Sequence, residues 1–402
     1  MSSNTSGIKA IQEKTKPHAN FEFSSPSSYY PRLTTMPFGP FALQWRAPST
    51  NPPTGTPLPS GITRSYVKTP SGPLELLSAV PSTPNPSKPP LFFAHGGFGC
   101  ASVWLQYMTF FSSHGYACYA LSYRGHGGSW YPGFWSMYFT GRHAIGEDLV
   151  AGIKEVEKLE TERRKSNERV RVVLVSHSAG GALSQYVLSR GMCVVQGFCM
   201  LAAVPGFGSW SCYKFWFLSA PINFYYRCFH SKYLMATTKQ VKDAFFTSDT
   251  PNPVVKDLER LLSPYESMCW PMQALSPFVT GPDVLSRITG WSPRKASSVQ
   301  ANSPAGITPR LLVLAAEHDV LCTPPVLEDA AKRYRTAFHH CVRAGKLDGI
   351  SESDARIEAN EQEGEDRDGV AFVVVKGMAH HLQNHENWQR GAEVLLHWTE
   401  KL

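Results

Sequence analysis

The sequence lacks several features that define whole classes of protein. No apolar stretch approaches the roughly 18 residues that a membrane-spanning helix needs, and the first ten residues, MSSNTSGIKA, contain nothing like the apolar core of a secretory signal. No internal repeat occurs along the 402 residues. Hydrophobic residues make up 42% of the chain and charged residues 18%, which excludes collagen-like, coiled-coil and wholly disordered proteins.

Cysteine pairs of the C-x-x-C type are also missing. The nine cysteines are odd in number and scattered along the chain, which is typical of reduced, intracellular proteins rather than of a disulfide framework or a zinc ribbon. We therefore expect a soluble cytoplasmic protein. Two weaker signals favour other compartments: the Ser-rich, acid-poor residues 1–60 resemble a mitochondrial transit peptide, and the terminal Glu-Lys-Leu is a distant form of the peroxisomal Ser-Lys-Leu signal.

The charge balance is only mildly basic. Lys and Arg number 39 against 32 Asp and Glu, a net charge of +7, which is too small a surplus to indicate a nucleic-acid partner. Residues 347–368 hold nine acidic residues and two arginines, so this segment is expected to be a solvated acidic surface loop. The remaining chain is more basic than the total, which would favour anionic substrates or lipid headgroups.

Proline is concentrated at one end of the chain. Seventeen of the 31 prolines lie in residues 1–90, where they disfavour helices and interior strands. Residues 1–62 are therefore expected to form a Pro/Ser-rich, disordered N-terminal extension. Regular structure is expected to begin near Thr63, with a strand, a turn and a second strand that ends at Val80.

From Leu91 onward, short apolar runs alternate with segments of helical period. Continuous apolar runs are expected for strands buried on both faces of a parallel sheet, and six occur: Leu91–Ala94, Ala117–Ser122, Val170–Ser176, Gly197–Ala203, Leu311–Ala316 and Ala371–Lys376. Apolar residues spaced i, i+4, i+7 lie between or after them, as in Leu149, Ile153 and Val156, and in Trp388, Ala392 and Leu395. This alternation predicts an α/β fold with a mostly parallel central sheet flanked by helices.

One segment interrupts this alternation. Residues 205–300 contain no convincing buried strand but many aromatic residues between Trp210 and Tyr233. We expect a helical insertion after the sixth strand, which divides the α/β core into residues 63–204 and 301–402. The aromatic side chains would mostly form the core of this insertion, with a membrane-contacting surface as the alternative.

The strongest chemical signal is the segment Val175-Ser176-His177-Ser178-Ala179-Gly180-Gly181. It follows an apolar strand and precedes a segment of helical spacing, which is the setting of a nucleophile elbow. There a sharp, strained turn presents the central Ser178, and small residues are needed two positions on either side because strand and helix crowd together. Ser176 replaces the usual first glycine but keeps the side chain small. The alternative is a glycine-rich turn with an incidental serine.

A serine nucleophile needs a base and a group that orients the base. Candidates follow the last two apolar runs, where Glu317-His318-Asp319 and Gly377-Met378-Ala379-His380-His381 occur. Asp319 is the preferred acid, with Glu317 as the alternative, because the chain must bend beyond the strand before the carboxylate. His380 is preferred to His381 because it lies three residues after Gly377, in the loop that leads to the last helix.

Acyl transfer also needs backbone donors for the oxyanion. The N–H of Ala179, directly after the nucleophile, is one candidate. The second is Gly97 in His95-Gly96-Gly97-Phe98-Gly99, with Phe98 as the alternative. A phosphate-binding loop is the competing interpretation of these glycines, but neither G-x-G-x-x-G nor G-x-x-x-x-G-K-[ST] is present.

Metal ligands are a second possibility for the histidines. His381 and His385 are four residues apart, but the segment between them lacks the glutamate of H-E-x-x-H. We therefore expect no metal and no organic cofactor.

Together, His95–Gly99, the loop Ser122-Tyr123-Arg124-Gly125-His126-Gly127-Gly128-Ser129, the Ser178 elbow, Asp319 and His380 resemble the α/β-hydrolase superfamily, particularly its lysophospholipase-like and esterase-like serine hydrolases. The resemblance covers about residues 63–402 without the acidic loop. It implies that Arg124 and His126 are scaffold residues and that residues 205–300 form a helical cap over the active site. The stretch from Phe245 to Glu266 is similar to the usual end of that cap.

These residues lead us to expect a serine hydrolase that cleaves a carboxylic ester of a largely apolar small molecule through a Ser178–His380–Asp319 triad and an acyl-enzyme. A thioesterase or acyltransferase acting on a biosynthetic acyl intermediate would use the same residues. A non-catalytic protein of this fold that binds an apolar ligand is the alternative of another class. The sequence does not indicate an oligomeric state.

Overall fold

The fold was obtained as a computed structural model, which describes residues 34–38, 41–53, 55–83, 85–294, 306–353, 366–367 and 369–402. All of these belong to one compact unit, Leu33–Leu402. Residues 1–33 of the expected N-terminal extension lie outside the described residues, as do residues 354–365 and 368 of the expected acidic loop.

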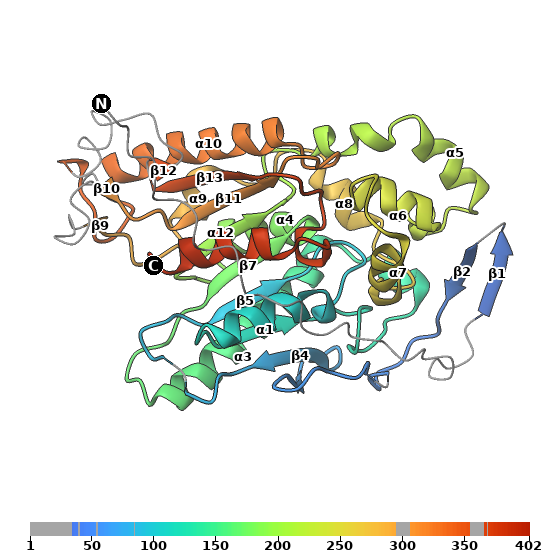
Figure 1. Cartoon of the computed structure of the whole chain (residues 1–402), viewed down its shortest axis with the longest axis horizontal. Helices are drawn as coiled ribbons and strands as arrows, with labels where there is room; N and C mark the ends of the chain where they lie inside the picture. The colour runs from blue at the N-terminus through green and yellow to red at the C-terminus, as the bar shows by residue number, and fades with distance from the viewer. Residues whose placement is uncertain are drawn as a thin grey trace, which may run out of the picture. The chain divides into compact units, whose positions relative to one another are not determined.

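A nine-stranded sheet forms the centre of the structure (Figure 1). Its strands are β3 (Thr63–Val67), β4 (Leu74–Ala79), β5 (Leu91–Ala94), β6 (Cys118–Leu121), β7 (Val173–His177), β8 (Gly197–Leu201), β11 (Leu311–Ala316), β12 (Asp366–Arg367) and β13 (Val370–Val375). They lie in the order β12-β13-β11-β8-β7-β5-β6-β4-β3. The six strands from β13 to β6 are parallel, and β12, β4 and β3 pair antiparallel at the edges. The prediction of a mostly parallel sheet is confirmed.

The central strands are the apolar runs of the sequence. Every residue of β5, β6, β7, β8 and β11 is buried, as expected for parallel strands covered on both faces. The predicted start of one strand at Val170 is wrong, since β7 begins at Val173. The N–H of Val170 instead donates to the side-chain hydroxyl of Thr161 at 3.0 Å, which ties this part of the run to the preceding helix.

Helices pack on both faces of the sheet. On one face lie α1 (Leu105–Ser113) and α12 (Gln389–Thr399), side by side in Figure 1, and on the other lie α3 (Arg142–Arg164), α4 (Ala179–Ser189) and α10 (Pro324–Arg343). The predicted apolar stripe of α3 is buried against the sheet. The short helix α2 (Phe134–Tyr138) precedes α3. Among the described residues, none of the helices combines the length and the apolar character needed to cross a bilayer.

The chain leaves the sheet after β8, which is its sixth strand in chain order. The described residues between β8 and β11 form seven helices, namely η2 (Trp210–Trp216), α5 (Ser219–Tyr226), η3 (Ser231–Leu234), α6 (Thr238–Phe245), α7 (Asn252–Leu261), α8 (Cys269–Ala274) and α9 (Gly281–Leu285). A two-residue pair, β9 (Pro293–Arg294) and β10 (Gly306–Ile307), ends the segment. The helical character agrees with the expected insertion, while residues 295–305 lie outside the described residues.

The proline-rich region before β3 also contains regular structure. Strands β1 (Thr34–Phe38) and β2 (Phe41–Trp45) form an antiparallel hairpin. Beyond it, Ser49 and Tyr131 exchange two backbone hydrogen bonds of 2.7 and 2.9 Å, and His230 Nε2 lies 3.1 Å from the carbonyl oxygen of Gln44. These contacts were not predicted from the proline content. Each is made by a residue other than proline, whose backbone N–H or carbonyl group can form a hydrogen bond.

Candidate active site

Ser178 lies at the turn between β7 and α4. Its backbone has φ 52° and ψ −127°, a conformation that residues other than glycine rarely adopt. A Cβ atom on Gly180 would lie 2.2 Å from the carbonyl oxygen of His95, and one on Gly181 would lie 2.3 Å from Ala203 Cβ. Strand and helix are therefore so close that only glycine fits at these two positions, and the geometry matches the sharp turn that the sequence predicts.

The structure also explains the serine that replaces the first glycine of the motif. Ser176 is buried, and its hydroxyl lies 2.7 Å from the hydroxyl of Ser184 on α4. Each hydroxyl thus satisfies the other, so the pair avoids the free-energy penalty of an unpaired buried polar group.

Three strand ends bring Ser178, His380 and Asp319 together. His380 Nε2 lies 2.8 Å from Ser178 Oγ, and His380 Nδ1 lies 2.8 Å from Asp319 Oδ2. Because an ionised carboxylate only accepts hydrogen bonds, Nδ1 carries the ring proton and Nε2 is left to accept from the serine hydroxyl. A general base aligned in this way can take the proton of an attacking serine.

The backbone holds the Asp319 carboxylate in place. Its second oxygen, Oδ1, accepts the N–H groups of Leu321 at 2.8 Å and Cys322 at 2.9 Å. The side chain is fully buried, so these bonds stabilise its charge where water cannot. Asp319 is thereby fixed to orient the imidazole of His380.

The alternative acid and base of the sequence prediction have other partners. Glu317 accepts the Gly377 N–H at 2.8 Å and pairs with Lys376 at 3.1 Å, and these contacts lower the pKa of its carboxyl. The buried His381 packs against the ring of His177 at a centroid distance of 4.6 Å, and burial lowers its pKa to about 3. Glu317 therefore does not take the place of Asp319 beside His380, and His381 does not take the place of His380 beside Ser178.

Two contacts that the sequence did not reveal hold His380. His177 Nε2 lies 3.0 Å from the carbonyl oxygen of His380, so this nitrogen donates, and burial keeps the pKa of His177 well below its usual value. The ring of Phe245, at the end of α6, stacks on the His380 ring with centroids 5.5 Å apart. The only signals for these residues are the position of His177 next to Ser178 and the place of Phe245 at the start of the cap-like stretch Phe245 to Glu266.

The predicted oxyanion donors lie next to each other. Ala179 is the first residue of α4, and the first N–H groups of a helix have no acceptor within it. A Cβ atom on Gly97 would lie 4.0 Å from Ala179 Cβ, so the two backbones flank one site beside Ser178. The alternative donor, the N–H of Phe98, already donates to Glu266 Oε2 at 2.9 Å.

A small cavity opens beside these donors. Its apolar lining includes Ile145, Leu183 and Trp270, and its polar lining includes Tyr123, His126 and Glu266. The cavity therefore combines an apolar wall with a few polar groups, as ligand sites commonly do.

Within the described residues, Asp319, Cys322 and His380 are the one group of side chains close enough together to hold a metal ion. In this group the Asp319 carboxylate and the His380 imidazole are hydrogen-bonded to each other. The nitrogen Nε2 of His385 lies 3.3 Å from the Thr247 hydroxyl and 3.4 Å from that of Thr250, so His381 and His385 do not share a ligand site.

The loop of the Arg-Gly-His-Gly motif has two different roles in the structure. The guanidinium of Arg124 makes a bidentate pair with Asp148 on α3, with both contacts at 2.7 Å, in agreement with a scaffold role. His126 instead pairs with Glu266 at 2.9 Å, next to the cavity. The sequence did not indicate this pair, because 140 residues separate its members.

Several solved structures are similar to this one. The structure is similar to an esterase from Thermogutta terrifontis, with 13% identity, a TM-score of 0.52, and coverage of 84% of this chain and 98% of the other. It is also similar to the esterase EaEST from Exiguobacterium antarcticum, with 13% identity, a TM-score of 0.52 and coverage of 84% and 100%. An enol-lactonase from Burkholderia xenovorans gives 13%, 0.51, and 83% and 99%.

At this level of identity these three structures show a shared fold. Comparison with curated protein sequences gave no match. The family model described as the alpha/beta hydrolase family matches residues 91–358, which is more than half of the chain. The chain therefore belongs to the alpha/beta hydrolase family.

Proposed function

We propose that this protein is a serine hydrolase that cleaves carboxylic esters of largely apolar small molecules. The observation that carries the proposal is the chain of two 2.8 Å contacts from Ser178 through His380 to Asp319. In this mechanism, His380 takes the hydroxyl proton as Ser178 attacks the ester carbonyl, and Asp319 stabilises the imidazolium that forms. His380 then returns the proton to the leaving alcohol.

The second half of the reaction uses the same groups. A water molecule gives a proton to His380 and attacks the acyl-enzyme, and collapse of the second tetrahedral intermediate releases the acid and restores Ser178. The N–H groups of Ala179 and Gly97 are the proposed donors to the oxyanion in both steps. We favour Gly97 over Phe98 because the Phe98 N–H is committed to Glu266. These steps require only protein groups and water.

The proposed substrate class rests on the small cavity that Gly97 and Ala179 help to line. Ile145, Leu183 and Trp270 offer an apolar wall, which favours an apolar acyl or alcohol group. A thioester would place its carbonyl in the same position, and an alcohol in place of water would turn hydrolysis into acyl transfer. Thioesterase and acyltransferase activities are therefore the second candidates.

We propose that residues 205–300 act as a cap over this site. Phe245 on α6 stacks on His380, and Trp270 and Glu266 line the cavity. The side chains that contact the proposed base and line the cavity thus come from the insertion as well as from the α/β core, so the insertion would influence which substrates enter.

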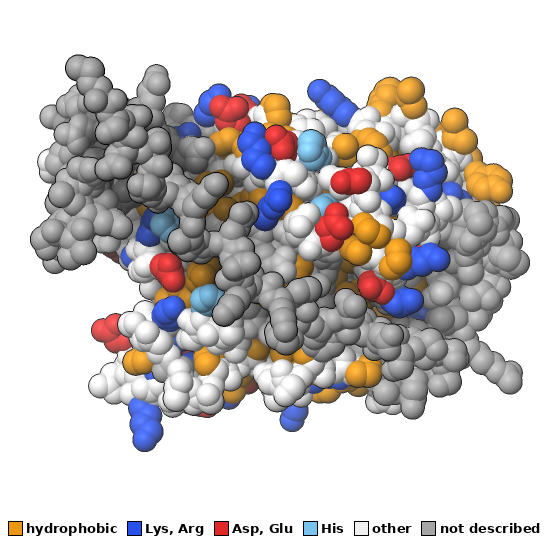
Figure 2. Space-filling view, in the orientation of Figure 1, with side chains coloured by type: hydrophobic (Ala, Val, Ile, Leu, Met, Phe, Trp, Pro, Cys, Tyr) orange, Lys and Arg blue, Asp and Glu red, His pale blue; other side chains and the backbone are white. Residues whose placement is uncertain are grey.

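We also propose that the outer surface of this cap contacts anionic lipid. The α5 surface consists of Phe217, Leu218, Ile222, Tyr225 and Tyr226, which are 59–81% exposed, and Figure 2 shows apolar side chains at the edge of the molecule where α5 lies in Figure 1. Residues 205–242 contain five Lys or Arg and no Asp or Glu; of these five, Arg227 is buried and Lys239 pairs with Asp243. Exposed aromatic and aliphatic side chains flanked by basic residues are typical of surfaces that bind anionic bilayers.

Vesicle co-sedimentation tests the lipid contact. The double variant Leu218→Ser with Ile222→Ser should lose binding to vesicles that contain phosphatidylserine, while Leu159→Ser, which changes an exposed residue of α3, should bind as the wild type does. Equal binding of all three proteins, or no binding of the wild type, would contradict the proposal.

A cytoplasmic location is proposed on the cysteines. All nine are free thiols, and seven of them are buried, which favours a reducing compartment. Fractionation of cells that produce the full chain would test this location against the mitochondrial and peroxisomal alternatives.

A chain-length series of esters and acyl-CoA thioesters tests the proposed activity. Turnover should be measurable with the wild type and absent with Ser178→Ala, and the preferred series would separate esterase from thioesterase. A folded wild-type protein that binds apolar ligands without turning over any member of the series would support the non-catalytic alternative.

A further inference from the structure

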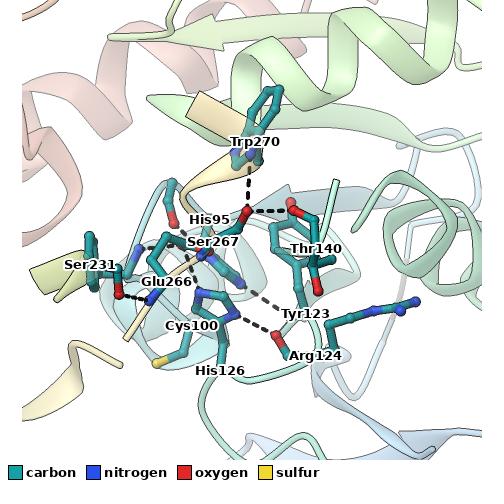
Figure 3. A network of polar contacts seen from close by, with 12 residues as sticks. His95, Cys100, Tyr123, Arg124, His126, Thr140, Ser231, Glu266, Ser267 and Trp270 are labelled. Atoms are coloured by element: carbon teal, nitrogen blue, oxygen red, sulfur yellow. Dashed lines mark hydrogen bonds and ion pairs between the residues drawn. The ribbon is translucent and has the colours of Figure 1, made fainter. Parts of the chain in front are cut away.

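One buried carboxylate connects three loops that are far apart in the sequence (Figure 3). Glu266, between α7 and α8, is 6% exposed. Its Oε2 accepts the N–H of Phe98 at 2.9 Å and lies 2.9 Å from Nε2 of His126, and its Oε1 accepts the N–H of Ser267 at 2.8 Å. The end of the cap segment is thereby bonded to the loop after β5 and to the loop after β6.

The hydrogen bonds of His126 determine its protonation. Its Nδ1 lies 2.8 Å from the carbonyl oxygen of Arg124, which can only accept, and its Nε2 faces the carboxylate of Glu266. Both ring nitrogens therefore donate, and the side chain is an imidazolium. Burial opposes this charge, but the attraction and hydrogen bond of Glu266 outweigh it and raise the pKa of His126. Burial likewise opposes the Glu266 anion, whose pKa the contact with His126 lowers.

His95, whose ring lies 5.0 Å from that of His126, is in the opposite state. Its Nδ1 donates to the carbonyl oxygen of Gly96 at 2.8 Å, and its Nε2 accepts the N–H of Tyr123 at 3.2 Å. This arrangement requires the neutral ring, and burial lowers the pKa of His95 to about 3. His95 thus anchors, as a neutral side chain, the first half of the glycine loop His95–Gly99.

The second half of the loop is strained and depends on the cap segment. Phe98 has φ 60°, a left-handed conformation that is strained for a bulky residue. Besides the bond from its N–H to Glu266, its carbonyl oxygen accepts the N–H of Ser263 at 2.7 Å. Both backbone groups of Phe98 are therefore held by residues 263–266, and Gly97 lies between this anchor and that of His95.

We propose that Glu266 and His126 are positioning residues for the oxyanion site: their pair holds Phe98 in its strained conformation and so directs the neighbouring Gly97 N–H toward the substrate carbonyl oxygen. The inference rests on the proposed function. A Cβ atom on Gly97 would lie 3.9 Å from Glu266 Oε2, so an unpaired carboxylate there would repel the developing oxyanion. The charge of His126 balances it.

Glu266→Gln tests this role, because glutamine keeps the shape but removes the charge and one acceptor. Glu160→Gln is the matched control: Glu160 is also a fully buried carboxylate, bonded to Arg163, Arg164 and Tyr119 in the core, away from the cavity. Active sites are counted after labelling with a fluorophosphonate has run to completion, so that a slower reaction does not lower the count, and kcat and KM for p-nitrophenyl acetate are measured per counted site.

For Glu266→Gln we expect kcat to fall by about 10²-fold, the loss that follows removal of one oxyanion donor, with KM within about threefold. Glu160→Gln should lower the melting temperature but leave both constants per counted site unchanged. A purely structural role of Glu266 would give the same pattern as Glu160.

The pH profile provides a second readout. The charged or titratable groups that face His126 are Glu266 from the cap segment, Asp148 from α3, His95 from the loop after β5, and Tyr123 and Arg124 from its own loop. The two carboxylates favour the imidazolium, Arg124 is paired with Asp148, and His95 is neutral. Wild-type kcat should therefore decline at alkaline pH as His126 loses its proton, and Glu266→Gln should move this decline to lower pH, whereas Glu160→Gln should not move it.

The outcomes separate the two proposals. A wild type that neither takes up the label nor hydrolyses the ester contradicts the proposed function and the inference with it. An active wild type together with a Glu266→Gln variant whose kcat is within threefold of it and whose pH profile is unchanged overturns the inference alone. If Glu266→Gln does not fold, His126→Gln takes its place, since it keeps a donor toward Glu266 but removes the cation; an unchanged kcat per site would again overturn the inference.

Discussion

Replacing Asp319 with asparagine tests the proposed triad at the residue that should change its chemistry most and its shape least. The carboxylate accepts three hydrogen bonds, from Leu321 and Cys322 through Oδ1 and from His380 through Oδ2. The amide oxygen of asparagine can keep the first two. Its amide nitrogen then lies where Oδ2 was, 2.8 Å from His380 Nδ1, and faces that nitrogen with a donor.

The consequence for catalysis follows from the imidazole tautomer. His380 Nδ1 must now accept, so the ring proton moves to Nε2 and points at Ser178 Oγ, and the serine loses its base. The wrong tautomer in a serine triad costs about 10⁴-fold in kcat, which corresponds to about 5 kcal/mol of transition-state stabilisation. The fold should survive, because the backbone bonds of residue 319 are retained.

The assay is the hydrolysis of p-nitrophenyl acetate at neutral pH, with thermal unfolding measured on the same samples. Glu317→Gln is the control, since Glu317 is the alternative acid and contacts Gly377 and Lys376 instead. We expect this variant to retain kcat within about threefold. A kcat for Asp319→Asn within tenfold of the wild type, or an equal loss for Glu317→Gln, would refute the assignment of the acid.

Two further predictions concern stability. Gly181→Ala should lower the free energy of unfolding by about 1–3 kcal/mol, and with it the melting temperature, because the added methyl group overpacks against Ala203. The second substitution Ala203→Gly should restore much of this loss. An unchanged melting temperature for Gly181→Ala would contradict the close packing. Burial lowers the pKa of His95, His177 and His381, so the unfolded chain binds their protons first as pH falls below about 6.5. Below that pH, each of these histidines should lower the free energy of unfolding by up to about 1.4 kcal/mol per pH unit, until the histidine is also protonated in the folded protein. Urea unfolding that does not depend on pH between 6.5 and 4 would contradict the neutral state of these buried rings.

The sheet and the meeting of Ser178, His380 and Asp319 were predictable because their signals are local. Each central strand is a continuous apolar run, and the residues that meet at the site lie one, three and five residues after the ends of β7, β11 and β13. Carboxyl ends of parallel strands gather at one edge of a sheet, so Ser178, Asp319 and His380 could be placed together without knowledge of any contact. The choice of Asp319 over Glu317 depended on the bend after β11, which the order of residues also indicates.

The contacts that the sequence missed join residues that are far apart along the chain. Glu266 and Phe98 are 168 positions apart, and His177 and His380 are 203 apart. Such pairs have no period or motif, because they arise only when loops from different strands and the cap segment converge. The hairpin β1–β2 was missed for a different reason: proline disfavours strands on average, but its effect depends on which backbone groups the neighbours use.

Mass-spectrometric mapping of a fluorophosphonate label tests the central claim most directly. The reagent forms a covalent bond with a serine oxygen only when a base activates it and donors stabilise the resulting oxyanion. We predict that the wild-type protein takes up one label per chain, on the peptide that contains Ser178, and that Ser178→Ala takes up none. Absence of labelling in folded wild-type protein, or a label on any other serine with Ser178 unmodified, would contradict the account.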